Sequence, residues 1–366
     1  MKWNFAFKRK TDSPKVKKSK TREWVDAIVF AVIASTIIRG LLFSAYAIPS
    51  GSMEGTELTG DYLFVSKFSY GPRMPFTPLS IPFTEPTIAG GIKTYWNSIQ
   101  LPYFRLPGTS EIKKGDIVVF NKPAEADLNI PVDERTTLIK RCQATPGDLL
   151  TIVNAQVYIN GKAAVNASKA QTSYDVITNG VDINPQVFTD LNITVLGQSS
   201  ANLFEMIIPN DNLATFKGYS NIKSVTPVIQ PAGQYDAQVF PSNQKFKWNM
   251  DNFGPLVLPK KNWTIQLNDS TLVLYRRAIE TYEHNKVEVS GNDILINGKK
   301  AETYTFKMNY YWMMGDNRHD SLDSRFWGYV PEDHVIGKAL ITWMSIDSTK
   351  DMFHKIRWNR ILKPIN

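Results

Sequence analysis

Two side chains of this sequence are suited to nucleophilic catalysis: a serine in a tight turn and a lysine in an apolar strand. Ser52 lies in AIPSGSMEGTELTGDYLFV, where a turn rich in Ser, Gly and Pro leads directly into a predicted strand. Lys140 lies in TTLIKRCQATPGD. A lysine acts as a general base only when it is neutral, so its pKa must fall from about 10.4 toward 7–8. Burial without a carboxylate neighbour lowers it in this way. If TLIKRC is a strand, Lys140 shares one face with Leu138 and Cys142.

Each of these residues also has a simpler explanation. An ordinary turn accounts for Ser52, and a lysine at a strand end that extends to solvent accounts for Lys140. Ser52 is not in a G-x-S-x-G elbow, and no histidine lies near it in the sequence. A Ser-His-Asp triad assembled from distant segments stays possible, because such triads are defined by geometry rather than by sequence order. The pair therefore needs support from the rest of the chain.

A third polar cluster, GDNRHDSLDSRFWGYVPEDHVIGKA, spans residues 315–339. It could be a structural turn, a metal-binding loop or a corner held by Asp–Arg pairs. Its acids at 316, 320 and 323 imitate the spacing of a calcium loop, but Arg318 and Arg325 would repel a cation. The ion-pair interpretation is therefore favoured. One cysteine and four scattered histidines make a structural zinc site improbable, and we expect no metal and no cofactor.

The N-terminal part of the chain has the pattern of a membrane anchor. Nine of the 42 Lys and Arg residues but only one of the 34 Asp and Glu residues lie in residues 1–22, so the rest of the chain is close to neutral. The apolar stretch 25–47 follows and is long enough to cross a bilayer as a helix. A cleavable signal peptide ending at Ala45-Tyr46-Ala47 and a buried helix are the alternatives. Arg39 and the long basic tail favour an anchor, with the N-terminus in the cytoplasm and the body on the opposite side. Charge confined to a tail argues against a nucleic-acid partner and fits a lipid bilayer.

The rest of the chain predicts a mainly β fold with antiparallel sheets. Short alternating or apolar runs are closed by turn residues, and Asn160-Gly161 and Asn297-Gly298 are hairpin signals. The predicted strands are 62–68, 116–120, 137–142, 149–153, 156–161, 293–298 and 339–344. Residues 70–108 contain seven prolines and several aromatic residues, which predicts an irregular segment that packs on the body or dips into the membrane interface.

These elements suggest a division of the chain into six parts. The predicted parts are a basic cytoplasmic tail (1–22), a transmembrane anchor (23–45), a catalytic β domain in two parts (46–150 and 305–350), an inserted β region (151–304) and a basic, aromatic C-terminal tail (351–366).

Four motifs in this order behind an anchor resemble the bacterial type I signal peptidases. PSGSM at 49–53 with GD at 60–61 resembles the family's nucleophile box, and KGDIVVF at 114–120 resembles its strand box. KR…PGD at 140–148 is similar to the lysine box, and GDNR…S.DSR.WG.VP at 315–331 is similar to the C-terminal box. Together the four boxes cover about a ninth of the chain.

The resemblance implies a role for each matching residue. Ser52 would be the nucleophile and Lys140 the general base, the Ser52 N–H and the Ser50 hydroxyl would form the oxyanion hole, and Ser321 would orient the lysine. Supporting residues would brace the corner, namely Asp316, Arg318, Asp323, Arg325 and Arg141. The pockets for the small −1 and −3 residues of the substrate would be lined by Tyr46, Ile48, Met53 and Ile139.

The implied activity is removal of signal peptides from exported preproteins by a single-pass enzyme of the bacterial plasma membrane, with its catalytic domain on the outer side. The sequence departs from the family's common pattern at Gly55, where proline is usual, and at Glu57, where an apolar residue is usual. It also departs at His319-Asp320 and Cys142–Ala144. A self-cleaving repressor-type peptidase and an inactive β scaffold that binds preproteins are the alternatives. The anchor argues against the first, and the intact Ser52, Lys140 and Ser321 argue against the second.

Overall fold

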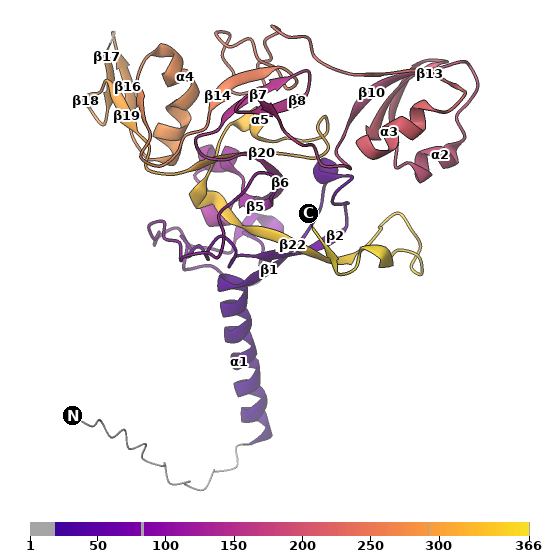
Figure 1. The fold of residues 1–366 in the computed structure, drawn as a ribbon. Coiled ribbons are helices and arrows are strands. Elements are labelled where there is room, and N and C mark those ends of the chain that lie inside the picture. Colours follow the sequence, from indigo (N-terminus) through magenta and orange to yellow (C-terminus); the bar gives the residue numbers. More distant parts are fainter. Residues whose placement is uncertain (1–18, 82–83, 292, 366) are drawn as a thin grey trace, which may run out of the picture.

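A computed structural model describes residues 19–81, 84–291 and 293–365, so most of the predicted basic tail lies outside the described residues. The chain begins with the helix α1 (Lys20–Leu41), which projects from the body with no buried residue (Figure 1). With 22 residues, the helix is long and apolar enough to cross a membrane. Ser19 caps the helix by accepting a hydrogen bond from the backbone N–H of Arg22.

The helix is shorter than the apolar stretch 25–47 and the predicted anchor 23–45. It ends at Leu41, and Phe43–Ala47 form the strand β1 instead. The reason is tertiary pairing, because all five residues of β1 pair in antiparallel register with β2 (Asp61–Ser66). The end of the apolar stretch therefore belongs to the body and joins the helix rigidly to the sheet that carries Ser52.

The predicted antiparallel β fold is confirmed, and its centre is one large sheet. The strand order is β1-β2-β22-β5-β6-β20-β21, and β23 pairs with β22. Five residues of β5 are all buried, as expected for a central strand with both faces covered. The strands beyond β2 are β5 (Ile117–Asn121), β6 (Thr137–Ala144), β20 (Tyr310–Met314), β21 (Val330–Pro331), β22 (Val335–Ser345) and β23 (Lys363–Pro364).

A second sheet has the order β14-β7-β8-β9 and lies farther from α1 (Figure 1). Its hairpin turns at Asn160-Gly161, where both residues have positive φ, as a type I′ turn requires. Asn297-Gly298 has the same geometry in the hairpin between β17 and β18. The strands of the second sheet are β7 (Leu149–Val153), β8 (Gln156–Ile159), β9 (Lys162–Ala163) and β14 (Phe253–Val257).

The predicted inserted region contains helices as well as strands. One part is a four-stranded sheet, β11-β12-β10-β13, and α2 and α3 pack on its apolar core. This part lies on the side of the molecule opposite α4 (Figure 1). Its elements are β10 (Gln171–Thr178), α2 (Pro185–Asp190), β11 (Thr194–Ser200), β12 (Leu203–Pro209), α3 (Asn210–Lys217) and β13 (Ile222–Pro227).

Another part of the inserted region extends the main aromatic core around Trp312, Tyr275 and Tyr329. The helix α4 (Asp269–Arg277) begins at a capping box in which Asn268 and Thr271 bond reciprocally. Its other elements are β15 (Thr264–Gln266), β16 (Val287–Ser290), β17 (Asp293–Ile296), β18 (Lys299–Lys300) and β19 (Thr303–Thr305).

Residues 70–81 and 84–108 are largely irregular, as their prolines predict. The short strands β3 (Thr87–Ile88) and β4 (Ile92–Lys93) are the only paired strands described there. Arg73 attaches the segment to the body, since it donates hydrogen bonds to the side chain of Asn121 and the carbonyl of Asp333. Trp96 and Phe104 are more than half exposed.

Candidate active site

Ser52 and Lys140 lie in direct contact. Ser52 sits in the one-turn 3₁₀ helix Gly51–Met53, which links β1 to β2, and Lys140 sits in the middle of β6. The distance between Lys140 Nζ and Ser52 Oγ is 2.6 Å, and Nζ also donates to the carbonyl oxygen of Ile139 at 2.9 Å. Both side chains are buried. If the amine is neutral, its bond to Ile139 leaves the lone pair free to accept the Ser52 proton across the same short distance.

Burial changes the proton affinity of Lys140. Desolvation lowers the pKa of its amine to about 8, although the carboxylates of Asp323 and Asp316 oppose the shift. Neither carboxylate forms an ion pair with Lys140 within the described residues, because each is bound to an arginine. An appreciable fraction of Lys140 is therefore neutral near neutral pH, which is the state that a general base needs.

The first of these ion pairs joins β6 to the loop after β20. The Arg141 guanidinium donates to both carboxylate oxygens of Asp316, with Nη2 2.7 Å from Oδ2, and both side chains are buried. Thr56 Oγ also donates to Asp316, at 2.6 Å. The backbone N–H of Asn317 then donates to the Ser52 carbonyl at 3.1 Å. The loop therefore holds the turn that carries Ser52 from two sides.

The second ion pair forms the corner below that loop. Asp323 accepts two bonds from the Arg325 guanidinium and caps the short helix α5 (Ser324–Trp327). It also accepts from the N–H of Gly315 at 3.1 Å. A Cβ on Gly315 would lie 2.2 Å from Ser321 Oγ and 2.4 Å from the Ser52 carbonyl oxygen, so only glycine lets these two segments meet.

Ser321 and Ser50 reach the site but do not yet make the contacts predicted for them. Ser321 Oγ is buried and forms no well-aligned hydrogen bond with a described residue. It lies close enough to Asp323 to help Arg325 lower the pKa of that carboxyl. Ser50 is exposed and extended, directly before the turn of Ser52. Arg318 is buried beside Arg325 and donates to Asn166 at 3.2 Å, and burial lowers its pKa to about 10.

The four residues predicted to line the substrate pockets meet in one apolar cluster. Ile48 and Met53 are buried there, and Tyr46 and Ile139 pack against them. Ile139 directly precedes Lys140 and Met53 directly follows Ser52, so the cluster adjoins the reacting pair. Ile365, near the end of the chain, packs on the same cluster.

The sequence did not predict the buried ion-pair cluster that Glu57 and Asp61 form with Arg360 of the C-terminal segment. Arg360 bonds both oxygens of Asp61 and lies 3.3 Å from Glu57, although about 300 residues separate the partners. Thr342 also donates to Glu57. Burial raises the pKa of Glu57 to about 7 in spite of the opposing charge of Arg360. A polar residue at a position that is usually apolar was the only local signal of this cluster.

We expect Arg360→Ala to destabilise the protein by about 2–4 kcal/mol, because it leaves two buried carboxylates without their cation. Thermal unfolding of the full chain in detergent measures the effect. Arg357→Ala is the matched control, since its longer pair with Asp347, at 3.4 Å, is partly exposed. Equal shifts of the melting temperature in the two variants would contradict the assigned role of Arg360.

Two other departures from the family pattern have a structural explanation. Gly55 has a φ of +93°, which proline cannot adopt, and a Cβ there would lie 2.1 Å from the carbonyl oxygen of Lys169. His319 accepts at Nδ1 from the N–H of Ser173, and its Nε2 lies 3.0 Å from Asp251. Both residues thus attach the inserted region to the loops of the candidate site.

The calcium-loop alternative for residues 315–339 finds no support in the geometry. Asp316 and Asp323 each bind an arginine, and the described residues hold no group of three or more His, Cys, Asp or Glu side chains suited to a metal ion. The ion-pair interpretation describes this corner correctly.

Known proteins resemble this chain over most of its length. The family described as "Signal peptidase, peptidase S26" matches residues 21–216 and 263–344. Signal peptidase I of Buchnera aphidicola subsp. Acyrthosiphon pisum is 27% identical over 330 residues, which cover 90% of this chain and 77% of that protein. Signal peptidase I of Haemophilus influenzae is 24% identical over 330 residues, covering 90% and 71%. Signal peptidase I of Rickettsia felis is 32% identical over 156 residues, covering 42% and 48%.

The family match covers the turn that carries Ser52, the strand that carries Lys140 and the loop that contains Asp316 and Ser321. The chain therefore belongs to the signal peptidase family, peptidase S26, and is a serine endopeptidase of that family.

Proposed function

We propose that this protein removes N-terminal signal peptides from exported preproteins, cutting after small residues at −1 and −3, with Ser52 as nucleophile and Lys140 as general base. The observation that carries the proposal is the 2.6 Å contact between Ser52 Oγ and a buried lysine that forms no ion pair with a carboxylate among the described residues. The relatives named Signal peptidase I supply the substrate class.

In this mechanism neutral Lys140 takes the proton of Ser52 as Oγ attacks the scissile carbonyl. The resulting oxyanion accepts hydrogen bonds from the Ser52 N–H and the Ser50 hydroxyl, which bind the charge that develops in the transition state. Protonated Lys140 then gives its proton to the leaving amine, and an ester on Ser52 remains. Lys140 next deprotonates a water molecule, whose oxygen attacks the ester, and then returns the proton to Ser52 Oγ as the bond to the signal peptide breaks.

The experiment uses the purified full chain in detergent and a preprotein with an Ala-x-Ala site. We expect a single cut after the second alanine, identified by the mass of the mature product. Replacing the −1 alanine with a bulky residue should abolish this cut, because the proposed specificity accepts only a small side chain at −1. Cleavage at other positions, or none, would contradict the proposed specificity.

We propose that α1 anchors the body at the outer face of the plasma membrane, with the basic N-terminus in the cytoplasm. Two segments with exposed apolar side chains run near the level where α1 meets the body (Figure 1). The irregular segment exposes Ile92, Trp96, Leu101 and Phe104, and the C-terminal segment exposes Met352, Phe353, Trp358 and Leu362. Exposed aromatic and aliphatic side chains of this kind suit the membrane interface, where signal peptides emerge.

Ser321 is proposed as the positioning residue of Lys140. We expect Ser321→Ala to lower kcat about 10- to 100-fold, while Ser321→Thr, which keeps the hydroxyl, retains most of the activity. A positioning role also shifts the apparent pKa of the pH–rate profile, because the hydroxyl would bond the lysine amine. An unchanged profile and unchanged kcat in Ser321→Ala would remove the hydroxyl from the mechanism.

A further inference from the structure

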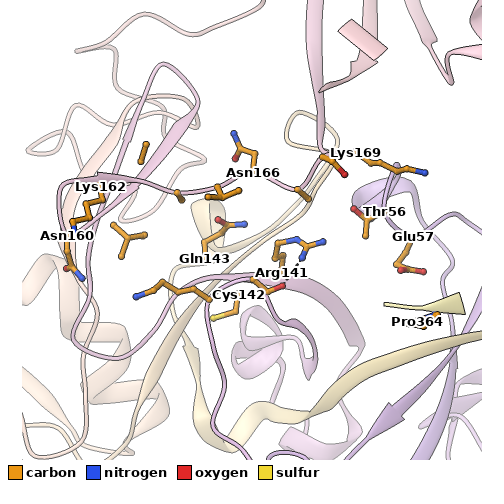
Figure 2. Close-up of a pocket in the computed structure, with 18 of the residues that line it drawn as sticks. Thr56, Glu57, Arg141, Cys142, Gln143, Asn160, Lys162, Asn166, Lys169 and Pro364 are labelled. Carbon is orange, nitrogen blue, oxygen red and sulfur yellow. Dashed lines mark hydrogen bonds between the residues drawn. The ribbon is translucent and has the colours of Figure 1, made fainter. Parts of the chain in front are cut away.

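A cavity of about 850 Å³ lies next to the candidate site but contains neither Ser52 nor Lys140 in its lining (Figure 2). Its walls come from β6, from residues 159–169, from the turn at Thr56 and Glu57, and from Lys363 and Pro364. The volume lies in the range of ligand-binding pockets. Nothing in the proposed mechanism uses this cavity.

The lining of this cavity is strongly cationic. Lys162, Lys169 and Lys363 are exposed at its edge, and none of the three forms an ion pair with a described residue. The other charged side chains of the lining are already paired: Lys114 with Asp148, Arg141 with Asp316, and Glu57 with Arg360. Burial, together with the nearby Arg360 and Lys169, lowers the pKa of Lys363. Cations crowded in this way favour an anionic ligand.

A buried amide in the same cavity also lacks a partner. Gln143 is only 5% exposed, and its side chain forms no hydrogen bond with any described residue. Figure 2 shows it in the middle of the cavity between Arg141 and Asn166. Its amide is open to the cavity rather than sealed in the core, so a ligand with peptide-like hydrogen-bonding groups could bond it there.

The cavity continues from the predicted −1 and −3 pockets along the same strand. Side chains of a strand alternate, so Ile139, Arg141 and Gln143 share one face of β6. Ile139 belongs to the apolar cluster, whereas Arg141 and Gln143 line the cavity. Gln143 lies about 10 Å beyond Lys140 along the strand, at about 3.3 Å per residue. A substrate with its upstream residues on the apolar cluster would thus extend its downstream residues toward the cavity.

The turn after Ser52 gives a similar distance between the reacting pair and the cavity. Gly55 contacts the carbonyl of Lys169 and lies three positions after Ser52, so the Cα atoms of Ser52 and Gly55 are at most about 11 Å apart. An extended chain cut at Ser52 therefore reaches the lysines with roughly the third to sixth residue after the scissile bond.

Resting on the proposed function, we propose that this cavity binds the early mature segment of the preprotein and selects acidic side chains at about the third to sixth positions. The residues directly after the cut are not included, because Glu54 and Asp320 flank Gly51 and would repel a carboxylate there. A peptide is favoured over a lipid headgroup, since β8, which contributes one wall, lies at the end of the body away from α1 (Figure 1).

The test compares three preprotein-derived peptides that share residues −6 to +2 and carry Asp, Gln or Lys at +3 to +6. For the full chain in detergent at low ionic strength, we expect kcat/KM for the Asp peptide to exceed that for the Lys peptide about fivefold. The preference should shrink as salt rises, because the lysines are exposed. The double variant Lys169→Glu/Lys363→Glu should reverse the preference. The control variant Lys223→Glu/Lys299→Glu has the same net charge at exposed sites outside the cavity and should keep it.

Two results would overturn the proposal. One is equal kcat/KM for the three peptides in an enzyme that still cleaves the Gln peptide, which would leave the proposed function intact. The other is an unaltered charge preference in the double variant combined with weaker binding of that variant to vesicles of anionic lipid, which would assign the lysines to the membrane. Failure to cleave any of the peptides would instead contradict the proposed function.

Discussion

Ser52→Ala is expected to reduce kcat by about 10⁴- to 10⁶-fold, and Lys140→Ala should reduce it to a similar extent. Neither side chain has a substitute at the site: the hydroxyl is the only nucleophile bonded to Nζ, and Nζ is the only base bonded to Oγ among the described residues. Because the two act as a unit, the double variant should be little slower than either single variant. Mass analysis of the preprotein cleavage products measures all three rates.

Lys140→Arg provides the control for this experiment. Arginine keeps the positive charge and much of the volume, but it stays protonated and cannot accept the proton of Ser52. We expect Lys140→Arg to be as inactive as Lys140→Ala. If Lys140→Arg kept activity within tenfold of the wild type, the lysine would serve only as a charge, and a different base would have to be found.

Asp316→Ala is expected to destabilise the protein by about 3–5 kcal/mol. The substitution leaves the buried Arg141 without its carboxylate and removes the acceptor of Thr56. Loss of this pair also loosens the loop that holds the Ser52 carbonyl, so kcat should fall together with stability. Denaturant unfolding of the full chain in detergent, with activity measured on the same preparation, tests both effects.

Glu280→Ala is the matched control for Asp316→Ala. Glu280 pairs with Arg276 at 3.0 Å, but both side chains are exposed, so its loss should cost less than about 1 kcal/mol. Similar destabilisation by the two substitutions would show that burial of the Arg141–Asp316 pair does not matter. If the Asp316→Ala variant were stable but inactive, Asp316 would act directly in the reaction rather than by holding the loop.

The parts of the fold that could be predicted are those with local signals. The predicted strand at 62–68 corresponds to β2, and the one at 137–142 corresponds to β6. The Asn-Gly pairs form type I′ turns. These features could be predicted because the alternation of apolar and polar residues and the positive φ of Asn-Gly depend only on residues that are neighbours in the sequence. The small helices of the inserted region escaped prediction. The helix α4 is only nine residues long, and its capping box uses Asn268 and Thr271 rather than the common Ser/Thr and Glu.

The site divides in the same way. The contact of Ser52 with Lys140 could be anticipated from a turn, an apolar strand and the order of four motifs. The Arg360 cluster and the cavity lined by Lys169 and Lys363 could not, because their members lie about 200 to 300 residues apart and depend on the path of the C-terminal segment. Tertiary pairing likewise decided the end of α1, which composition alone placed too late.

The most direct test of the account is the pH dependence of Ser52 acylation. The rate at which a serine-directed acylating reagent modifies Ser52 is followed by mass spectrometry from pH 5 to 10. Burial lowers the pKa of Lys140 to about 8, and only the neutral amine can take the serine proton, so the rate should rise with pH and reach half its maximum near pH 8. In Lys140→Ala this titration should vanish. A midpoint near 10.5, or the same titration in Lys140→Ala, would contradict the assignment of Lys140 as the base.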